Sequence, residues 1–484
     1  MNDIIITEKE DVKEESIAET KEETKEDKIM KNVFINSFII SDSLREDIKR
    51  KEDNDKDKNK DKNDDKDKII LINNDIRNES RTGSIFKNKS KKYEDIYNYR
   101  KQLNISKKVR KFHLFNCECK NPSEDKIIYK LGKILLFTYR KNFPKITNFK
   151  TKKTYTTDAW WGCMLRCAQM ILSRGIYLSL KSKGLDTKNA LYYTVCLFNG
   201  YPITKDQLHP FFHGMLEKYK NNFGNENNEI KEFFPPFCLK TLCDVGEIYE
   251  RTAGEWFSDV ISTNIFKRIS EYFNLFSSPN LDIKILTFQS YIEMQDILNT
   301  CFIEKKKEKG NEEYIHLNGK YYYFNKMGLV FVNVRVGLDK IPPEYFRGIR
   351  NLFALKSCIG IIGGKTRLAY YFIGYNDEQN SLLYLDPHIT KDSDKEVTMF
   401  SILGKHINKE IHLLKMNKMS TAFTIGFCFR KYNEFLELFG FWQQVKQDKL
   451  KILGLAKQNV NYAPPKDNDE DFSPTYDDKD EDDF

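Results

Sequence analysis

The sequence predicts an α+β fold, because one long helical pattern is followed by a group of strand patterns. Between Met164 and Leu180, apolar residues recur at the spacing of an amphipathic helix. Three later segments, 329–336, 368–375 and 381–385, are rich in β-branched and aromatic residues and are typical of strands. The last two flank Asn376–Asn380, which predicts a hairpin turn. A late helix is expected over residues 432–445.

Composition divides the chain into three parts. From Arg45 to Lys68 only Ile48 is apolar, so this stretch cannot bury enough surface to offset the entropy of ordering. We therefore expect a disordered charged extension over residues 1–110, a folded domain over 111–450 and an acidic disordered tail over 451–484. Within the extension, an apolar island at residues 33–40 is suited to docking on another surface, as a helix or a strand.

Charge and cysteine usage argue against several classes of protein. The 79 basic and 71 acidic residues leave a net charge of +8, so no nucleic-acid partner is expected. The ten cysteines are scattered without a Cys-x-x-Cys pair, which indicates free thiols in a reducing compartment. His209 and His213 have the spacing of helical metal ligands, but Pro210 interrupts the pattern, and we expect no metal. No apolar stretch approaches the roughly 20 residues of a membrane span, so we expect a cytoplasmic protein.

Residues 157–166, Thr-Asp-Ala-Trp-Trp-Gly-Cys-Met-Leu-Arg, suggest a nucleophile. Cys163 would lie on the first turn of the predicted helix, where free N–H groups and the helix dipole favour the thiolate, the nucleophilic form of cysteine. Gly162 would permit a tight turn and leave the sulfur open to approach. The alternative for this segment alone is a buried structural cysteine.

The segment Leu383-Tyr-Leu-Asp-Pro-His388 suggests a base with its orienting acid. In extended backbone, residues two positions apart face the same side, and Pro387 biases Asp386 toward that geometry. A carboxylate beside an imidazole fixes its tautomer and stabilises the imidazolium, as in a catalytic triad. The alternative for this segment alone is a turn aspartate next to a surface histidine.

Together the two segments supply the nucleophile, base and acid of a thiol protease. The other histidines have no acid nearby in comparably constrained sequence; these are His113, His316, His406 and His412. The segment Gly363-Gly-Lys-Thr366 lacks the first glycine of a phosphate-binding loop, because Ile359 stands at that position. We interpret Gly363–Gly364 as a mobile loop beside the site.

These motifs resemble those of the autophagins, the cysteine proteases that process and delipidate a ubiquitin-like autophagosome modifier. The matching segments follow the family order over about residues 134–446. They are Phe137–Pro144, Trp161–Arg166 with Gln169, Gly254–Trp256, Ile361–Lys365, Tyr371–Tyr375 and Tyr384–His388. As a set they are specific to that family.

The resemblance implies a papain-like fold with a Cys-His-Asp triad of Cys163, His388 and Asp386. It further implies that Tyr139 contributes to the oxyanion site, and that Trp256 and the Gly363–Gly364 loop cover the cleft until a substrate lifts them. The implied substrates are a GABARAP-type modifier precursor, cleaved after its C-terminal glycine, and the conjugate of that modifier with phosphatidylethanolamine. Membrane contact would then be transient and made through the substrate, and no cofactor is implied.

The sequence also departs from the autophagin pattern. Trp160 stands where the family usually has glycine, which would narrow the approach to the nucleophile. This residue is the reason to keep one alternative, an inactive modifier-binding pseudoprotease. A ubiquitin-fold-modifier protease is the other alternative, although such enzymes usually carry an aromatic residue where this chain has Leu165. In the extension, Tyr93–Ile96 has the aromatic-x-x-aliphatic spacing of a modifier-docking motif.

Overall fold

The computed structural model describes most of the predicted domain and one segment of the extension. The described residues are 24–38, 104–105, 112–119, 131–223, 232–278, 281–307, 313–317, 319–365, 367–407, 410–447 and 454–456. The acidic tail after residue 456 and the Tyr93–Ile96 motif lie outside these ranges. Among the described residues, no helix combines the length and the apolar character needed to cross a bilayer.

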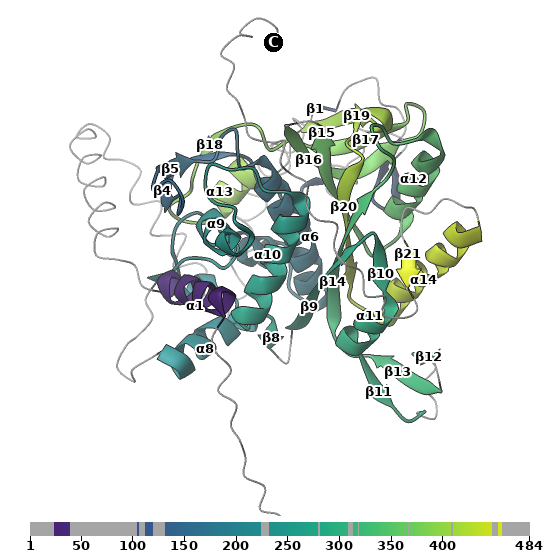
Figure 1. Ribbon diagram of the computed structural model, residues 1–484, viewed down its shortest axis with the longest axis horizontal. Coiled ribbons are helices and arrows are strands. Elements are labelled where there is room, and N and C mark those ends of the chain that lie inside the picture. The colour runs from purple at the N-terminus through teal and green to yellow at the C-terminus, as the bar shows by residue number, and fades with distance from the viewer. Residues whose placement is uncertain are drawn as a thin grey trace, which may run out of the picture.

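An eleven-stranded sheet forms one side of the molecule (Figure 1). Its main path, in spatial order, is β1 (Asn104–Ile105), β19 (Glu410–Lys415), β17 (Ser381–Leu385), β16 (Leu368–Asn376), β15 (Cys358–Lys365), β20 (Ala422–Phe429), β14 (Met327–Arg335), β9 (Leu281–Gln289) and β8 (Ser277–Ser278). The strand β2 (Phe112–Leu114) pairs with β16, and β3 (Cys117–Cys119) pairs with β2. The pairs β9–β14 and β1–β19 are parallel, and the other described pairs of this sheet are antiparallel.

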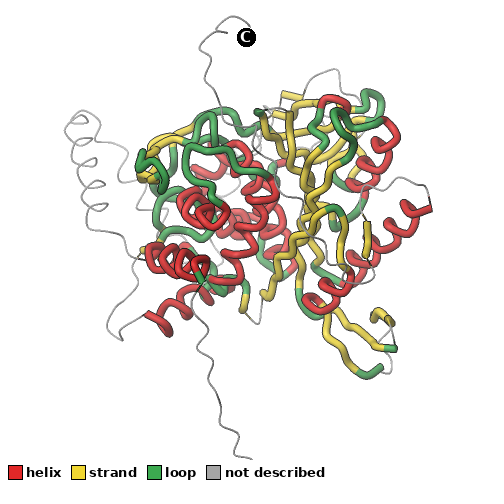
Figure 2. Tube along the Cα trace, viewed as in Figure 1, coloured by secondary structure: helices red, strands yellow, loops and turns green. Residues whose placement is uncertain are grey.

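Helices gather on the other side of the molecule, as the red and yellow tubes of Figure 2 show. They are α6 (Cys163–Ser182), α7 (Thr187–Cys196), α8 (Gly214–Phe223), α9 (Leu239–Gly246) and α10 (Asp259–Tyr272). Four further helices are α11 (Met294–Cys301), α12 (Phe346–Ala354), α13 (Met399–Ser401) and α14 (Tyr432–Gln447). The long helix α6 lies between the two sides and packs on β15, β16 and β20. This arrangement confirms the predicted α+β class, the predicted helices at α6 and α14, and the hairpin between β16 and β17.

Small residues let α6 approach the sheet closely. A Cβ atom at Gly175 of α6 would meet a side-chain methyl of Leu329 at 2.5 Å, and one at Gly426 of β20 would meet Ile171 at 2.6 Å. Both distances are far inside van der Waals contact, so a side chain at either position would force the neighbouring leucine and isoleucine side chains to shift. The tight packing fixes α6, and with it the position of Cys163, against the sheet.

Four small sheets complete the fold. One of them, with the order β18–β4–β5, lies beside the start of α6 (Figure 1). Its strands are β4 (Arg140–Thr147), β5 (Thr154–Thr157) and β18 (Lys391–Asp392). The remaining strands are β6 (Ile203–Thr204) with β7 (Glu232–Phe233), β10 (Tyr291–Glu293) with β21 (Gly454–Ala456), and the sheet of β11 (Phe302–Lys305), β13 (Lys320–Phe324) and β12 (Tyr314–Leu317).

One helix of the extension belongs to the folded body. The stretch Lys25–Phe38 forms α1, which packs against α9 and includes most of the apolar island. The ring of Phe34 is fully buried and contacts Tyr219, Tyr272 and Phe273. The expectation of a disordered extension over residues 1–110 is therefore wrong for α1, because aromatic partners far along the chain provide a surface for it.

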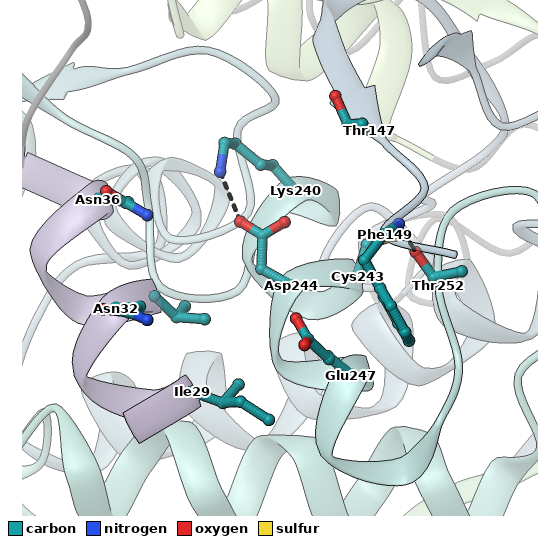
Figure 3. A pocket seen from close by; sticks show the side chains of 11 residues that line it. Ile29, Asn32, Asn36, Thr147, Phe149, Lys240, Cys243, Asp244, Glu247 and Thr252 are labelled. Carbon is teal, nitrogen blue, oxygen red and sulfur yellow. Dashed lines mark hydrogen bonds and ion pairs between the residues drawn. The ribbon is translucent and has the colours of Figure 1, made fainter. Parts of the chain in front are cut away.

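A cavity of about 330 Å³ separates part of α1 from α9 (Figure 3). Ile29, Asn32 and Asn36 line it from α1, and Lys240 and Asp244 line it from α9. The two charged residues pair with each other across one helical turn of α9. The cavity is thus a gap between docked elements on the helical side of the molecule.

Candidate active site

Cys163 is the first residue of α6, and the turn before it is held by one residue, Asp158. The backbone amides of Trp161 and Gly162 both donate to the Asp158 carbonyl oxygen. A Cβ atom at position 162 would lie 2.5 Å from the Asp158 carboxylate, so only glycine fits there. The Cys163 side chain is itself fully buried.

The side chain of Asp158 joins the turn before Cys163 to two other elements. Its Oδ1 accepts a hydrogen bond from the Arg140 amide of β4 at 2.6 Å. Its Oδ2 accepts from Nε of Arg166, one turn into α6, at 2.7 Å. Both Asp158 and Arg166 are buried. Because charge-assisted hydrogen bonds in a low-dielectric interior are strong and directional, this contact fixes α6 relative to β4.

His388 and Asp386 lie in the segment that follows β17. The carboxylate oxygen Oδ1 of Asp386 contacts Nδ1 of His388 at 2.5 Å and accepts a hydrogen bond from the His388 amide at 2.9 Å. The rings of Tyr139 and Tyr370 contact the imidazole edge-to-face, at centroid distances of 5.5 and 5.6 Å. The imidazole is therefore held by an acid on one nitrogen and by two aromatic rings on its sides.

Cys163 is close enough to His388 to influence its protonation. The second imidazole nitrogen, Nε2, is buried and has no hydrogen-bond partner within the described residues. Burial lowers the pKa of His388, but the contacts with Asp386 and with Cys163 outweigh it and raise that pKa to about 9. Burial raises the pKa of the Asp386 carboxyl, but the two hydrogen bonds from His388 outweigh burial, and the net effect is a lowered pKa. The site thus favours an imidazolium next to the Cys163 sulfur.

Tyr139 is clamped to the His388 segment by its backbone. The Tyr139 amide donates to the Pro387 carbonyl at 2.8 Å, and the Tyr139 carbonyl accepts from the Lys391 amide at 3.0 Å. The Tyr139 side chain is buried, and burial together with the adjacent Cys163 raises the pKa of its phenol. The hydroxyl therefore stays protonated at neutral pH and can serve as a hydrogen-bond donor beside the sulfur.

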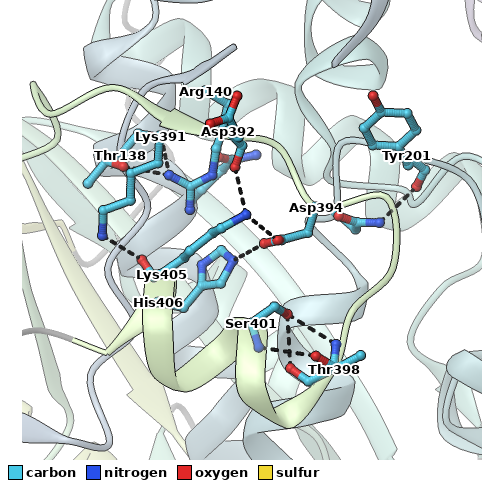
Figure 4. Close-up of polar contacts among 12 residues, drawn as sticks. Thr138, Arg140, Tyr201, Lys391, Asp392, Asp394, Thr398, Ser401, Lys405 and His406 are labelled. Atoms are coloured by element: carbon cyan, nitrogen blue, oxygen red, sulfur yellow. Dashed lines mark hydrogen bonds and ion pairs between the residues drawn. The ribbon is translucent and has the colours of Figure 1, made fainter. Parts of the chain in front are cut away.

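A second, partly buried polar cluster fastens the segment after His388 (Figure 4). Asp394 accepts from Nζ of Lys405 and lies 3.8 Å from Nε2 of His406. Burial lowers the pKa of His406 to about 4, although Asp394 opposes the shift. The Leu136 amide, close to Tyr139 in sequence, donates to the His406 carbonyl at 2.8 Å. This cluster thus ties the chain after His388 to the segment that carries Tyr139.

His406 also corrects one sequence interpretation. It has an acid close by, Asp394, and His113 likewise lies 3.6 Å from Asp377. The sequence showed neither pair, because each acid lies many residues from its histidine and is brought near by the fold. The ring of His113 stacks on Tyr375, and that of His406 contacts Phe137 edge-to-face.

Gly363 and Gly364 are in a strand, so their interpretation as a mobile loop is wrong. Both belong to β15, where they pair with Tyr370 and Ala369 of β16. The Gly364 carbonyl also accepts from the Ser420 amide at 2.6 Å. A glycine pair is common in loops, but here it is required because the neighbouring backbone comes so close that a Cβ at Gly364 would overlap the Leu368 carbonyl oxygen.

Trp256 lies in a loop that is fastened to the β4–β5 connection. Asn148 donates from its side-chain amide to the Ala253 carbonyl at 2.8 Å, and Lys150 pairs with Glu255 at 2.9 Å. The Trp256 side chain is 39% exposed. The loop that carries Trp256 is thus held in place by these contacts, and the indole is partly exposed to solvent.

Two positions important to the site were not singled out from the sequence, Asp158 and Arg166. Their signal was present, because Arg166 falls on a helix that is buried along most of its length. A charged residue on such a helix needs a buried partner, and an acid eight residues earlier was available. In the part of the chain that the structure describes, no three His, Cys, Asp or Glu side chains are grouped so as to hold a metal ion.

Comparison with known proteins identifies the family of this chain. The peptidase C54 catalytic domain matches residues 124–440, more than half of the chain and including Cys163, Asp386 and His388. This chain belongs to the peptidase C54 family. The C54 match covers β4, α6, β15, β16 and β17, the elements that build the site. It also confirms the papain-like class implied by the autophagin resemblance.

Individual C54 relatives are similar over most of the chain. The cysteine protease ATG4C of Xenopus laevis is 26% identical over 347 residues, which cover 66% of this chain and 70% of that protein. The cysteine protease ATG4A of Gallus gallus is 23% identical over 360 residues, covering 71% and 85%. The human cysteine protease ATG4C is 25% identical over 327 residues, covering 62% and 67%.

Proposed function

We propose that this C54 peptidase is a cytoplasmic cysteine endopeptidase that cleaves after the C-terminal glycine of a ubiquitin-like autophagy modifier precursor. The observation that carries the proposal is the pairing of His388 with Asp386, 2.5 Å from Nδ1, together with the influence of Cys163 on the pKa of that histidine. The names of the relatives, cysteine proteases ATG4C and ATG4A, support the same chemistry. In this proposal the partner is a GABARAP-type modifier.

The proposed reaction begins with attack of the Cys163 sulfur on the glycine carbonyl carbon. The tetrahedral oxyanion receives a hydrogen bond from the Tyr139 hydroxyl, which is protonated and lies beside the sulfur. The His388 imidazolium then gives its proton to the leaving amine, and a thioester on Cys163 remains. Asp386 holds the imidazole through Nδ1 during this step.

The second half of the reaction releases the modifier. His388, now neutral, takes a proton from a water molecule that attacks the thioester carbonyl. Cys163 leaves as the thiolate, which restores the starting pair. Phosphatidylethanolamine is joined to the modifier glycine by an amide, so the same steps release the lipid, and membrane contact then comes through the substrate. This chemistry uses side chains alone and calls for no cofactor.

The proposal assigns the covering and binding roles to residues near the cleft. Because Cys163 is buried, the substrate tail has to displace a covering side chain, and Trp256 is the candidate. Gly363 and Gly364 keep the substrate-binding role that the autophagin resemblance implies, and in this structure both are buried in β15 between β16 and β20. The side chain of Trp160, the reason for considering a pseudoprotease, is largely exposed to solvent.

The test is cleavage of a modifier precursor that carries a tag after its glycine. We expect tag release by the wild type, and no release but retained modifier binding by Cys163→Ala. Residual cleavage above about 1% of wild type in Cys163→Ala would remove this residue from the mechanism, since loss of a nucleophile costs several orders of magnitude. Binding without cleavage by the wild type would favour the pseudoprotease. A matching precursor of the ubiquitin-fold modifier serves as the specificity control.

A further inference from the structure

Trp160 combines two properties that are unfavourable for folding. Its side chain is 87% exposed, whereas the adjacent Trp161 is buried. Its backbone has φ = +76°, in the left-handed region that glycine adopts readily and bulky residues avoid. The resemblance to the autophagins places a glycine at this position, which agrees with the backbone geometry. This chain therefore presents a strained, solvent-exposed indole where a glycine would be relaxed.

The segment that carries Trp160 is rigid and close to the nucleophile. Trp160 precedes Cys163 by three residues, so the two Cα atoms are at most about 11 Å apart. On either side of it, the Ala159 amide donates to Oγ1 of Thr157 at 3.3 Å, and the Trp161 amide donates to the Asp158 carbonyl at 3.3 Å. The indole of Trp161 donates to the Thr157 carbonyl at 3.1 Å. Trp160 is thus held in place on a fixed turn.

A second exposed apolar side chain adjoins the proposed base. Ile389 directly follows His388 and is 56% exposed. Trp160 and Ile389 therefore bring apolar surface to the nucleophile segment and to the base segment, respectively. Neither contributes much to the core, because both are largely in water. Backbone strain and exposed apolar groups at an active site indicate a role in contact with another molecule.

We propose that Trp160 is a specificity-determining residue whose indole packs on an apolar side chain of the polypeptide substrate. A polypeptide whose scissile carbonyl reaches Cys163 comes within about 11 Å of the Trp160 backbone, because only three residues separate the two positions. Tryptophan supplies a large contact area with only two side-chain torsions to restrain, so the contact costs little entropy. Ile389 offers an apolar contact beside the base. The inference rests on the proposed protease function.

The experiment separates the indole from the backbone strain. Trp160→Ala removes the indole and keeps a Cβ at positive φ, Trp160→Gly removes both, and Trp160→Phe keeps an aromatic ring. The matched control is Phe400→Ala on α13, because Phe400 is also 87% exposed and lies outside the nucleophile and base segments. Each variant is assayed in the full chain for KM and kcat on the tagged soluble precursor, for melting temperature, and for alkylation of Cys163 by iodoacetamide.

We expect Trp160→Ala and Trp160→Gly to raise KM about tenfold or more, as truncation of an aromatic contact residue does, with Trp160→Phe between them and the wild type. Alkylation of Cys163 should stay at the wild-type rate, and Trp160→Gly should melt at or above the wild-type temperature. Unchanged KM in Trp160→Ala and Trp160→Gly would overturn the inference and leave the protease function intact. A wild type that cleaves no precursor would instead overturn the proposed function.

A further arm distinguishes polypeptide contact from lipid contact. The same variants are assayed for release of modifier from its phosphatidylethanolamine conjugate on phosphatidylcholine vesicles. If Trp160 contacts the polypeptide, KM changes equally for the soluble precursor and the vesicle-bound conjugate. A defect confined to the vesicles would show that the indole binds the bilayer, and would overturn the proposal.

Discussion

Nε of Arg166 donates a hydrogen bond to Oδ2 of Asp158 at 2.7 Å, and both side chains are buried. The other oxygen of the same carboxylate accepts from the Arg140 amide. One carboxylate therefore connects the first turn of α6 with β4, the two elements that present Cys163 and Tyr139. We infer that Asp158 and Arg166 are positioning residues for the proposed site.

Asp158→Asn is expected to weaken both folding and turnover. The Arg140 amide and Nε of Arg166 each donate to one oxygen of the Asp158 carboxylate. Asparagine has only one side-chain oxygen, so one of these donors would face its NH₂ group. The Arg166 charge would also be buried without its partner. Breaking a buried ion pair in this way costs about 3–5 kcal/mol of unfolding free energy. A small displacement of Cys163 from Tyr139 should lower kcat about 100-fold. Urea unfolding and steady-state cleavage of the tagged precursor measure the two effects.

The control for this change is the partly exposed ion pair of α9. Lys240 and Asp244 are one helical turn apart, 2.5 Å between charged atoms, and far more accessible than Asp158. Asp244→Asn should therefore change the unfolding free energy by at most about 1 kcal/mol and leave kcat unaltered. Equal losses of stability in Asp158→Asn and Asp244→Asn would contradict the positioning role.

The pH dependence of turnover should follow His388. Its pKa is raised to about 9, so the imidazolium that protonates the leaving amine is lost as pH rises through 9, and kcat/KM should fall there. Asp386→Asn removes the acid that raises this pKa, and the alkaline limb should move to lower pH. The rate should drop as well, because the equivalent change in a Ser-His-Asp triad costs about 10⁴ in kcat. An alkaline limb at the same pH in both proteins would place the orienting acid elsewhere.

The free energy of unfolding should also fall as the pH rises toward 9. A histidine with a raised pKa stabilises the folded state fully below the unfolded value, near 6.5, and this contribution is lost as pH rises to about 9. Wild-type protein should therefore lose unfolding free energy between pH 6.5 and 9. His388→Ala should show a shallower decline over that interval, measured by urea unfolding in matched buffers. A parallel decline in the two proteins would contradict the shift.

Tyr139→Phe should slow turnover and leave the local structure unchanged. The clamp between Tyr139 and the His388 segment is made by backbone atoms, so it survives loss of the hydroxyl. A donor to a developing oxyanion stabilises the transition state by about 2–4 kcal/mol. Loss of the hydroxyl should therefore raise the activation free energy by that amount and lower kcat, while KM stays near the wild-type value. Single-turnover cleavage of the tagged precursor measures this directly. An unchanged rate would assign the oxyanion contacts to backbone N–H groups alone.

Gly363→Ala and Gly364→Ala test whether this pair is a strand or a loop. In β15, a Cβ at Gly364 overlaps the Leu368 carbonyl, and one at Gly363 meets Cβ of Phe423 at 2.9 Å. Each change should therefore lower the unfolding free energy by about 1–3 kcal/mol, with Gly364→Ala the worse. Gly404→Ala is the matched control, because nothing lies within 4 Å of a Cβ at that position. Wild-type stability in all three variants would restore the loop interpretation.

The sequence predicted the parts of this protein that depend on local pattern. The helix after Cys163, the hairpin at Asn376–Asn380 and the Asp-Pro-His spacing each follow from neighbouring residues. Gly363–Gly364 was misassigned because a glycine pair is common in loops. In the structure the glycines are required by the close approach of the β16 backbone, and the sequence does not reveal that approach. The apolar island of α1 was expected to dock, but its partners could not be named, since they are spread over later helices.

Because α1 covers aromatic residues of later helices, it limits how far the chain can be shortened from its N-terminus. A protein that starts at residue 111, the boundary that composition suggests, would lack Phe34 and leave the rings of Tyr219, Tyr272 and Phe273 in water. Uncovered aromatic surface of this kind promotes self-association. Poor solubility of such a shortened protein would then reflect a missing helix, and a start before residue 24 keeps that helix in place.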